Sequence, residues 1–198
     1  FVGNDTEFNR HAISSNIDER TLREIYLLPF EMGVKQGSAK VVMSAYNKLN
    51  NIYCSSHQEL LIDILKEEWG FDGYVVSDWG AALETEENAN GGLDLEMPGP
   101  GNVWGASLIN SIKDGKVDEG LIDDKVKRIL TVANFSKRFE RPGFKPEEAI
   151  DQPAHRKLLR KAAADGMVLL KNEGLLPLKK NIKKLAVIGP NAKNAQII

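Results

Sequence analysis

The sequence contains little cysteine and little histidine, and it has no excess of charge of either sign. The single cysteine, Cys54, excludes an internal disulfide bond, and the three scattered histidines lack the spacing of metal ligands. The 26 basic and 28 acidic residues nearly cancel, so no charge patch indicates nucleic acid as a partner. We therefore expect no metal and no nucleic acid.

Long hydrophobic runs are also absent. The longest apolar stretches, at 41–43, 74–76 and 185–188, have the length of a strand, whereas a membrane-spanning helix needs roughly 20 residues. No membrane association is expected. The sequence starts at Phe1 without an initiator methionine, so we expect the beginning of the protein, including any signal peptide, to lie outside it. The localisation stays unknown.

The order of apolar and polar segments predicts an α/β protein. Residues 40–44 and 73–77 are expected to be buried strands, because short apolar runs lie between turn residues. Between them, residues 56–59 match a capping box that starts a helix, and Gly70 is expected to end it. The strands begin about 33 residues apart, the length of a βαβ unit, which predicts a parallel pair.

The remaining segments continue this alternation. A helix capped by Asp18 is expected to end at Gly33 or Gly37, and residues 46–55 are expected to form a loop. Further helices are predicted at 81–89, 106–113, 118–139 and 154–171, and short strands at 93–97 and 184–190. Residues 141–153 are rich in proline, glycine and glutamate and predict a linker. The pattern alone fits either a doubly wound sheet or part of a (β/α)8 barrel.

Chemistry in a parallel α/β fold collects where the strands end, and three groups of residues qualify. Asp78 follows the second strand and precedes Trp79, and Tyr46 follows the first strand. The entering segment 1–10 supplies Asn4, Asp5, Glu7 and Arg10. A carboxylate beside an aromatic ring suits sugar chemistry, because sugars stack on rings and glycosidic cleavage needs paired carboxylates. Taken alone, however, Asp78 is more simply a helix cap, and Tyr46 and Met43 are more simply core residues.

Two further carboxylates are assigned structural roles. Asp94 and Glu96 alternate with apolar residues, so they either line a barrel interior or face solvent at the end of a sheet. The glycines at 91–92 and 99–101 lack the spacing of a phosphate-binding loop, and turns explain them better.

Two long segments resemble a known family. Residues 43–50 (MSAYNKLN) and 68–79 (EWGFDGYVVSDW) closely resemble glycoside hydrolase family 3, in particular its β-glucosidases. Residues 92–100 and 168–178 are also similar, so the resemblance covers nearly the whole chain. It implies that residues 1–140 form the C-terminal half of a (β/α)8 TIM-type barrel, that 141–182 form a linker and a helix, and that 183–198 begin an α/β sandwich domain with its first strand.

The resemblance also implies roles for individual side chains. Asp78 matches the nucleophile of a retaining mechanism, and Trp79 matches the ring that lines the site on the aglycone side. Tyr46 matches a tyrosine beside the nucleophile, and Met43 matches a residue below the bound glycone. Arg10 matches an arginine that follows the family's Lys-His-Phe segment, and it is assigned to substrate binding.

The implied reaction is the hydrolysis of terminal β-D-glucosyl residues from a β-glucoside or oligosaccharide, without a cofactor. The family's general acid/base is a glutamate of the following domain, which we expect beyond Ile198, so the chain alone is expected to be inactive. Residues 1–4 depart from the family's β-N-acetylglucosaminidases. β-Xylosidase activity and a catalytically silent carbohydrate-binding homologue stay open as alternatives. Assembly of the full-length protein into a homo-oligomer also stays open.

Overall fold

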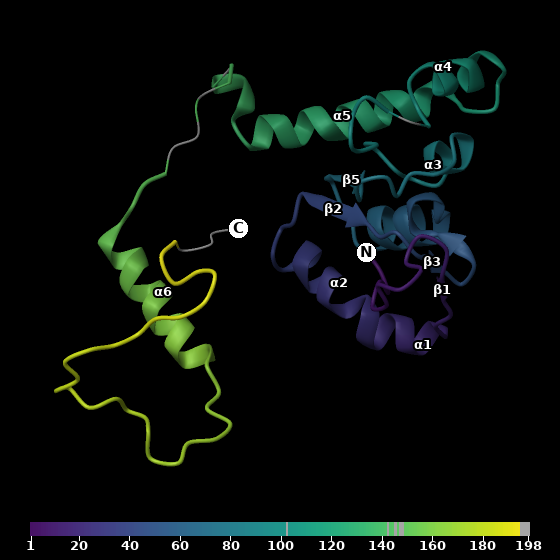
Figure 1. Ribbon diagram of the computed structural model, residues 1–198. Helices are drawn as coiled ribbons and strands as arrows, with labels where there is room; N and C mark the ends of the chain where they lie inside the picture. Colours follow the sequence, from purple (N-terminus) through teal and green to yellow (C-terminus); the bar gives the residue numbers. More distant parts are fainter. Residues whose placement is uncertain (102, 142, 145, 147–148, 195–198) are drawn as a thin grey trace. The chain divides into compact units, whose positions relative to one another are not determined.

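The structure is a computed structural model that describes residues 1–101, 103–141, 143–144, 146 and 149–194. The chain divides into two compact units, Phe1–Gly143 and Phe144–Ile198, and each is described by itself (Figure 1). Positions 142, 145 and 147–148 of the expected linker, and positions 195–198 of the expected sandwich domain, lie outside the described residues.

The first unit begins with a helical segment that has the predicted cap. The Asp18 carboxylate accepts the Thr21 N–H at 3.0 Å and starts α1. The helical path then continues past Gly33 and ends before Gly37. The elements of this segment are β1 (Ser14–Ser15), α1 (Glu19–Thr21), the π-helical η1 (Leu22–Tyr26) and α2 (Leu28–Lys35).

The predicted parallel pair of strands is confirmed. β2 (Val41–Ser44) and β5 (Tyr74–Ser77) lie side by side in parallel, with Val41 opposite Tyr74 and Ser44 opposite Ser77 (Figure 1). The ladder extends one step further, because the Asp78 N–H donates to the Ser44 carbonyl at 3.1 Å. The residues that follow both strands therefore leave the same edge of the pair.

The expectation that β2 is buried on both faces is wrong. Val42 and Ser44 are buried, whereas Val41 and Met43 are 42% and 44% exposed. Side chains alternate along a strand, and the described residues cover only the face that carries Val42. The other face of β2 is open.

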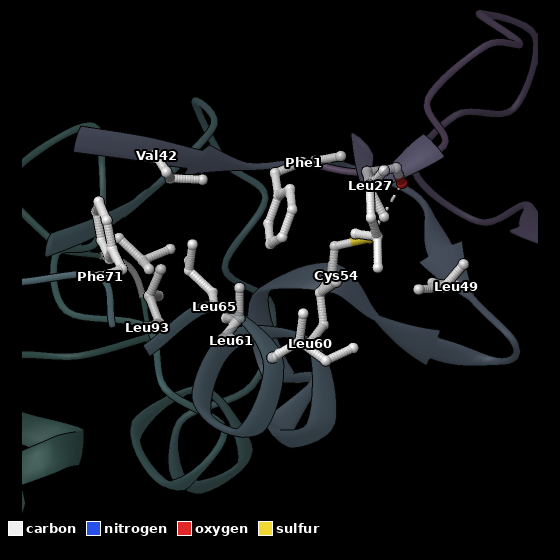
Figure 2. Packing of buried hydrophobic residues seen from close by; sticks show 14 of the residues in the cluster. Phe1, Leu27, Val42, Leu49, Cys54, Leu60, Leu61, Leu65, Phe71 and Leu93 are labelled. Atoms are coloured by element: carbon white, nitrogen blue, oxygen red, sulfur yellow. Dashed lines mark hydrogen bonds between the residues drawn. The ribbon is translucent and has the colours of Figure 1, made fainter. Parts of the chain in front are cut away.

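The covered face packs against the helix between the two strands, η3 (Glu59–Glu68). Its apolar side chains are buried as predicted, and Gly70, at φ 67°, ends it as predicted. The turns are π-helical, since the Trp69 N–H bonds to the Ile64 carbonyl five residues back. Figure 2 shows Leu61 and Leu65 pointing from η3 toward the side of β2 that carries Val42. The buried side chains of this helix and its end are Leu60, Leu61, Ile64, Leu65 and Trp69.

The predicted capping box at the start of η3 is wrong. The Ser56 hydroxyl bonds instead to Glu84 Oε2 at 2.8 Å and to Asn88 Oδ1 at 2.7 Å. The cap is His57, whose Nδ1 accepts the Leu60 N–H at 3.3 Å. Because its hydroxyl binds these two distant side chains, Ser56 does not cap η3.

The expected loop at 46–55 is in fact largely a hairpin. β3 (Lys48–Leu49) and β4 (Ile52–Tyr53) pair antiparallel, and β1 pairs in parallel with β3. Asn50 and Asn51 make the turn, with φ values of 49° and 74°. Asparagine tolerates this left-handed conformation better than most residues, so the Asn-Asn pair was the sequence signal for the hairpin. The 3₁₀ turn η2 (Cys54–Ser56) follows.

The later helices fall near their predicted positions, with shifted ends. α3 (Glu86–Asn90) begins later than predicted, α4 (Ala106–Lys113) matches, and α5 (Glu119–Phe135) ends earlier, before the 3₁₀ turn η4 (Arg138–Glu140). The strand expected at 93–97 is reduced to one parallel bridge between Val76 and Leu95. Among the described residues, no helix has both the length and the apolar character needed to cross a bilayer.

The second unit contains one helix, α6 (Pro153–Gly166), within its described residues. It ends earlier than the predicted residue 171. The strand expected at 184–190 does not form. A strand needs a neighbour for its backbone hydrogen bonds, and the described residues of this unit provide none.

Asp94 does not face solvent but braces β5 from inside the fold. Its Oδ2 accepts the Val75 N–H at 2.7 Å, and its Oδ1 pairs with Lys66 Nζ of η3 at 2.7 Å. Lys125 of α5 is also buried, and burial lowers its pKa to about 8 against the attraction of Asp94. The structural role assigned to Asp94 is confirmed, and this carboxylate joins β5 to η3.

We predict that His57→Ala lowers the free energy of unfolding by about 1 kcal/mol at about pH 7.5 and by much less at about pH 5.5. Burial lowers the pKa of His57 from its usual value of 6.5, and a proton on Nδ1 removes the acceptor of the Leu60 N–H. The unfolded chain takes up this proton first, so the His57 contribution is complete above about pH 6.5 and is lost as the pH falls.

Denaturant unfolding at both pH values measures this difference. His155→Ala, at an exposed position of α6, is the matched control and should have little effect at either pH. An equal cost of His57→Ala at the two pH values would contradict the proposed cap.

Candidate active site

The candidate site lies at the edge where β2 and β5 end. Tyr46 comes two residues after β2, and Asp78 directly follows β5. The parallel pairing brings them together, and the Tyr46 hydroxyl lies 3.0 Å from Asp78 Oδ1 and 3.0 Å from the Trp79 carbonyl oxygen. Residues 32 positions apart in the sequence thus share one hydrogen-bonded group.

The Asp78 carboxylate is oriented by its own turn as well as by Tyr46. Oδ1 accepts the Trp79 N–H at 2.7 Å, and the Asp78 carbonyl accepts the Ala81 N–H at 2.9 Å. The interpretation of Asp78 as a helix cap is wrong, because the next helix, α3, begins only at Glu86. Two donors on one oxygen fix the direction of this carboxylate at the edge of the sheet.

Tyr46 is held on its ring as well as at its hydroxyl. The ring is buried, the Arg10 guanidinium lies 4.4 Å from its centroid, and the His11 ring meets it edge-on at 4.4 Å. Burial first, and then the hydrogen bond to Asp78, raise the pKa of Tyr46. The hydroxyl therefore keeps its proton at neutral pH and donates it to the carboxylate.

Arg10 reaches this group through Tyr46 and is also paired with Glu7, whose Oε2 lies 2.7 Å from Arg10 Nη1. His11 was missed in the sequence analysis, and its only signal is its position next to Arg10. The Trp79 indole is 54% exposed beside the carboxylate, and Met43 lies on the open face of β2. Neither of these two side chains joins the hydrogen-bonded group around Asp78 within the described part of the chain.

The loop that carries Trp79 is fastened to the segment after Asp94. The Gly80 N–H donates to the Met97 carbonyl at 3.0 Å, and the Met97 N–H donates to the Ser77 hydroxyl at 2.9 Å. Glu96, which precedes Met97, is buried instead of facing solvent. Across the described ranges, no three His, Cys, Asp or Glu side chains gather in a way that could hold a metal ion.

Comparison with known proteins points to one family. Residues 1–132 match the family profile described as "Glycosyl hydrolase family 3 N terminal domain". A "Beta-glucosidase" of Rhizobium radiobacter is 48% identical over 199 residues, which cover 100% of this chain and 24% of that protein. A "Probable beta-glucosidase I" of Aspergillus niger is 46% identical over 196 residues, covering 98% of this chain and 24% of that protein. The chain thus spans about a quarter of the length of these curated relatives.

Solved structures give the same result. β-Glucosidase 3B from Thermotoga neapolitana in complex with glucose has a TM-score of 0.75 and 42% identity, covering 91% of this chain and 26% of that chain. β-Glucosidase from Kluyveromyces marxianus in complex with glucose has a TM-score of 0.79 and 39% identity, covering 91% and 22%. Both likenesses extend over nearly the whole chain, and the family profile matches well over half of it. The chain therefore belongs to glycosyl hydrolase family 3, in the part of that family's sequence that contains the N-terminal domain.

Proposed function

We propose that this chain is the nucleophile-bearing part of a retaining β-glucosidase that hydrolyses terminal non-reducing β-D-glucosyl residues. The observation that carries the proposal is the 3.0 Å hydrogen bond between Tyr46 and Asp78 at the shared edge of β2 and β5. Family membership and the β-glucosidase names of the relatives support the choice of substrate. The partner of the site is accordingly a β-glucoside or an oligosaccharide that ends in β-glucose.

The proposed fold is the C-terminal half of a (β/α)8 TIM-type barrel in residues 1–140. Two features of the structure support it: the parallel β2–β5 pair crossed by η3, and the bridge from Val76 to Leu95 that starts a third parallel neighbour. In a barrel, the open face of β2 with Val41 and Met43 becomes the face turned to the barrel interior. Residues 141–182 are then a linker and a helix, and residues 183–198 begin an α/β sandwich domain.

In the proposed mechanism the Asp78 carboxylate attacks the anomeric carbon. A bond forms between Asp78 and C1 while the glycosidic bond breaks, and a general acid protonates the departing oxygen. Water, deprotonated by the same group, then attacks C1 and releases the carboxylate. Because the hydrogen bonds from Tyr46 and Trp79 fall on Oδ1, Oδ2 is the attacking oxygen. The acid/base is a glutamate from a part of the protein outside this chain.

The remaining site residues keep the roles that the family resemblance implies. Trp79 presents an exposed indole, which suits stacking against the leaving group on the aglycone side. Met43 on the open face of β2 lies below the glucosyl ring, and Arg10 binds the substrate from above Tyr46. No step of this mechanism needs a cofactor or a metal ion.

We predict that a 2-deoxy-2-fluoro-β-D-glucoside with a good leaving group becomes covalently attached to Asp78 in the full-length protein. Fluorine at C2 slows both chemical steps, and the reactive leaving group keeps the first one fast enough for the intermediate to accumulate. Peptide mapping by mass spectrometry identifies the labelled residue. A label on Asp72, Asp94 or Glu96, or no label despite turnover of the unfluorinated substrate, would show that the nucleophile or the retaining course is misassigned.

We predict that Tyr46→Phe lowers kcat by about 10-fold to 100-fold in the full-length protein and changes the unfolding free energy by less than about 1 kcal/mol. The lost hydroxyl orients the nucleophile, whereas the ring and its contacts with Arg10 and His11 remain. Tyr53→Phe is the matched control, because its hydroxyl donates to the His11 carbonyl at 3.3 Å and not to Asp78. A large loss of stability with unchanged kcat would return Tyr46 to a purely structural role.

We predict that the isolated 198-residue chain does not hydrolyse an aryl β-glucoside, because the proposed mechanism takes its second carboxylate from another part of the protein. The assay compares the chain with the full-length protein and with its own Asp78→Ala variant. Turnover by the isolated chain that disappears in Asp78→Ala would refute the assignment of the acid/base to another part of the protein.

A further inference from the structure

Glu96 is a buried carboxylate that the proposed mechanism does not use. Its side chain lies in the fold with 8% of the residue exposed. Oε1 accepts the Val103 N–H at 3.0 Å, and Oε2 accepts the Trp104 N–H at 3.0 Å. Hydrogen bonds from backbone donors to an ionised carboxylate are among the strong ones in proteins, and burial strengthens them further. Glu96 therefore fixes the backbone of Val103 and Trp104 relative to its own segment.

The backbone at Gly101 packs closely against this carboxylate. A Cβ atom at Gly101 would lie 2.5 Å from Glu96 Oε2, a separation that van der Waals contact forbids. The backbone of Gly101 does not have a positive φ, so it is the close approach, and not the conformation, that disfavours a side chain there: a Cβ would push the Glu96 carboxylate aside. The close contact between the Gly101 backbone and Glu96 Oε2 therefore depends on both residues.

Met97, Val103 and Trp104, which adjoin or bind Glu96, also form hydrogen bonds with the loop that carries Trp79. These bonds lie near both ends of that loop. Near its start, the Gly80 N–H donates to the carbonyl of Met97, which follows Glu96 directly. Near its end, the Thr85 hydroxyl donates to the Val103 carbonyl at 2.7 Å. There the Trp104 indole N–H also donates to the Thr85 carbonyl at 3.2 Å. The Trp79 loop is therefore positioned by a segment whose own shape depends on Glu96.

The nucleophile itself is held by other contacts. The Asp78 backbone donates to the Ser44 carbonyl, and its carboxylate accepts the Tyr46 hydroxyl and the Trp79 N–H, so Asp78, Tyr46 and the Trp79 backbone form one hydrogen-bonded group. A change at Glu96 consequently acts first on the residues from Gly80 to Thr85, and it leaves the contacts of Asp78 with Ser44, Tyr46 and the Trp79 N–H in place. We therefore expect a change at Glu96 to affect the aglycone side of the site, where Trp79 is assigned to the leaving group.

We propose that Glu96 is a positioning residue that sets which leaving groups the site accepts. It acts through Met97, Val103 and Trp104 on the loop of Trp79, and it favours a sugar or another bulky group over a minimal one. The inference rests on the proposed β-glucosidase function and adds to it a determinant of aglycone selection.

The test uses the full-length protein with two substrates that share the glucosyl group. In β-D-glucosyl fluoride the leaving group is a single atom, whereas in a β-linked glucose disaccharide it is a second sugar. In Glu96→Gln, one of the two backbone N–H groups faces an amide NH2 and loses its acceptor. We expect kcat/KM for the disaccharide to fall about tenfold relative to that for the fluoride. The value for the fluoride, and the rate of Asp78 labelling by the fluoro sugar, should stay within about twofold.

Two further variants complete the design. Gly101→Ala perturbs the same contact while Glu96 stays intact, and it should change the substrate ratio in the same direction. It also carries the test if Glu96→Gln does not fold, which thermal unfolding of each variant determines. Glu67→Gln, at an exposed position of η3, is the control with the same chemical change and should leave the ratio unchanged.

The outcomes separate this inference from the function on which it rests. A selective loss on the disaccharide in both variants supports it. An equal loss on both substrates, or no loss in either variant, overturns it while the glucosidase function stands. A wild-type protein that hydrolyses neither substrate and is not labelled at Asp78 overturns both.

Discussion

The parallel pairing of β2 with β5 is the interaction on which the rest of the site depends. The two strands align Ser44 with Ser77, so the next residues of both segments emerge at one edge. A shift of the register by one residue would turn Val42 away from η3 and separate Tyr46 from Asp78. The apolar face of η3, which packs against Val42, fixes this register (Figure 2). Core packing and site geometry are thus consequences of the same alignment.

Three carboxylates in this unit show how surroundings decide the role of one functional group. Asp94 is sealed in the fold and balanced by Lys66, an arrangement in which removing one partner leaves a buried charge uncompensated. Glu96 is buried too, but backbone N–H groups satisfy it. Asp78 alone stands at the edge of the sheet, with donors on Oδ1 and an exposed indole beside it. Of the three, it has the access to solvent that a reacting group requires.

Much of this arrangement could be predicted from the sequence, because it depends on local pattern. The spacing of apolar residues predicted β2, β5 and η3, whereas Asp78 was singled out by the resemblance of residues 68–79 to glycoside hydrolase family 3. The His57 cap could not be predicted, since the competing partner of Ser56 is Glu84, which is far away in the sequence. The same holds for the open face of β2, because burial depends on what packs against a strand. The burial of Glu96 depends on a backbone that folds over it.

The carboxylate of Glu96 binds backbone groups and not side chains, and this has a consequence for how the protein can change over generations. A main-chain N–H is present in every amino acid except proline, so the two hydrogen bonds to Glu96 do not by themselves restrict the side chains at positions 103 and 104. Positions 96 and 101 are restricted directly, because one supplies the carboxylate and a Cβ at the other would lie 2.5 Å from its Oε2. At positions 103 and 104 the side chains are limited instead by their own contacts, because Val103 and Trp104 pack against the hydrophobic core and the Trp104 indole donates to the Thr85 carbonyl. The loop is therefore held both through its main chain and through its side chains.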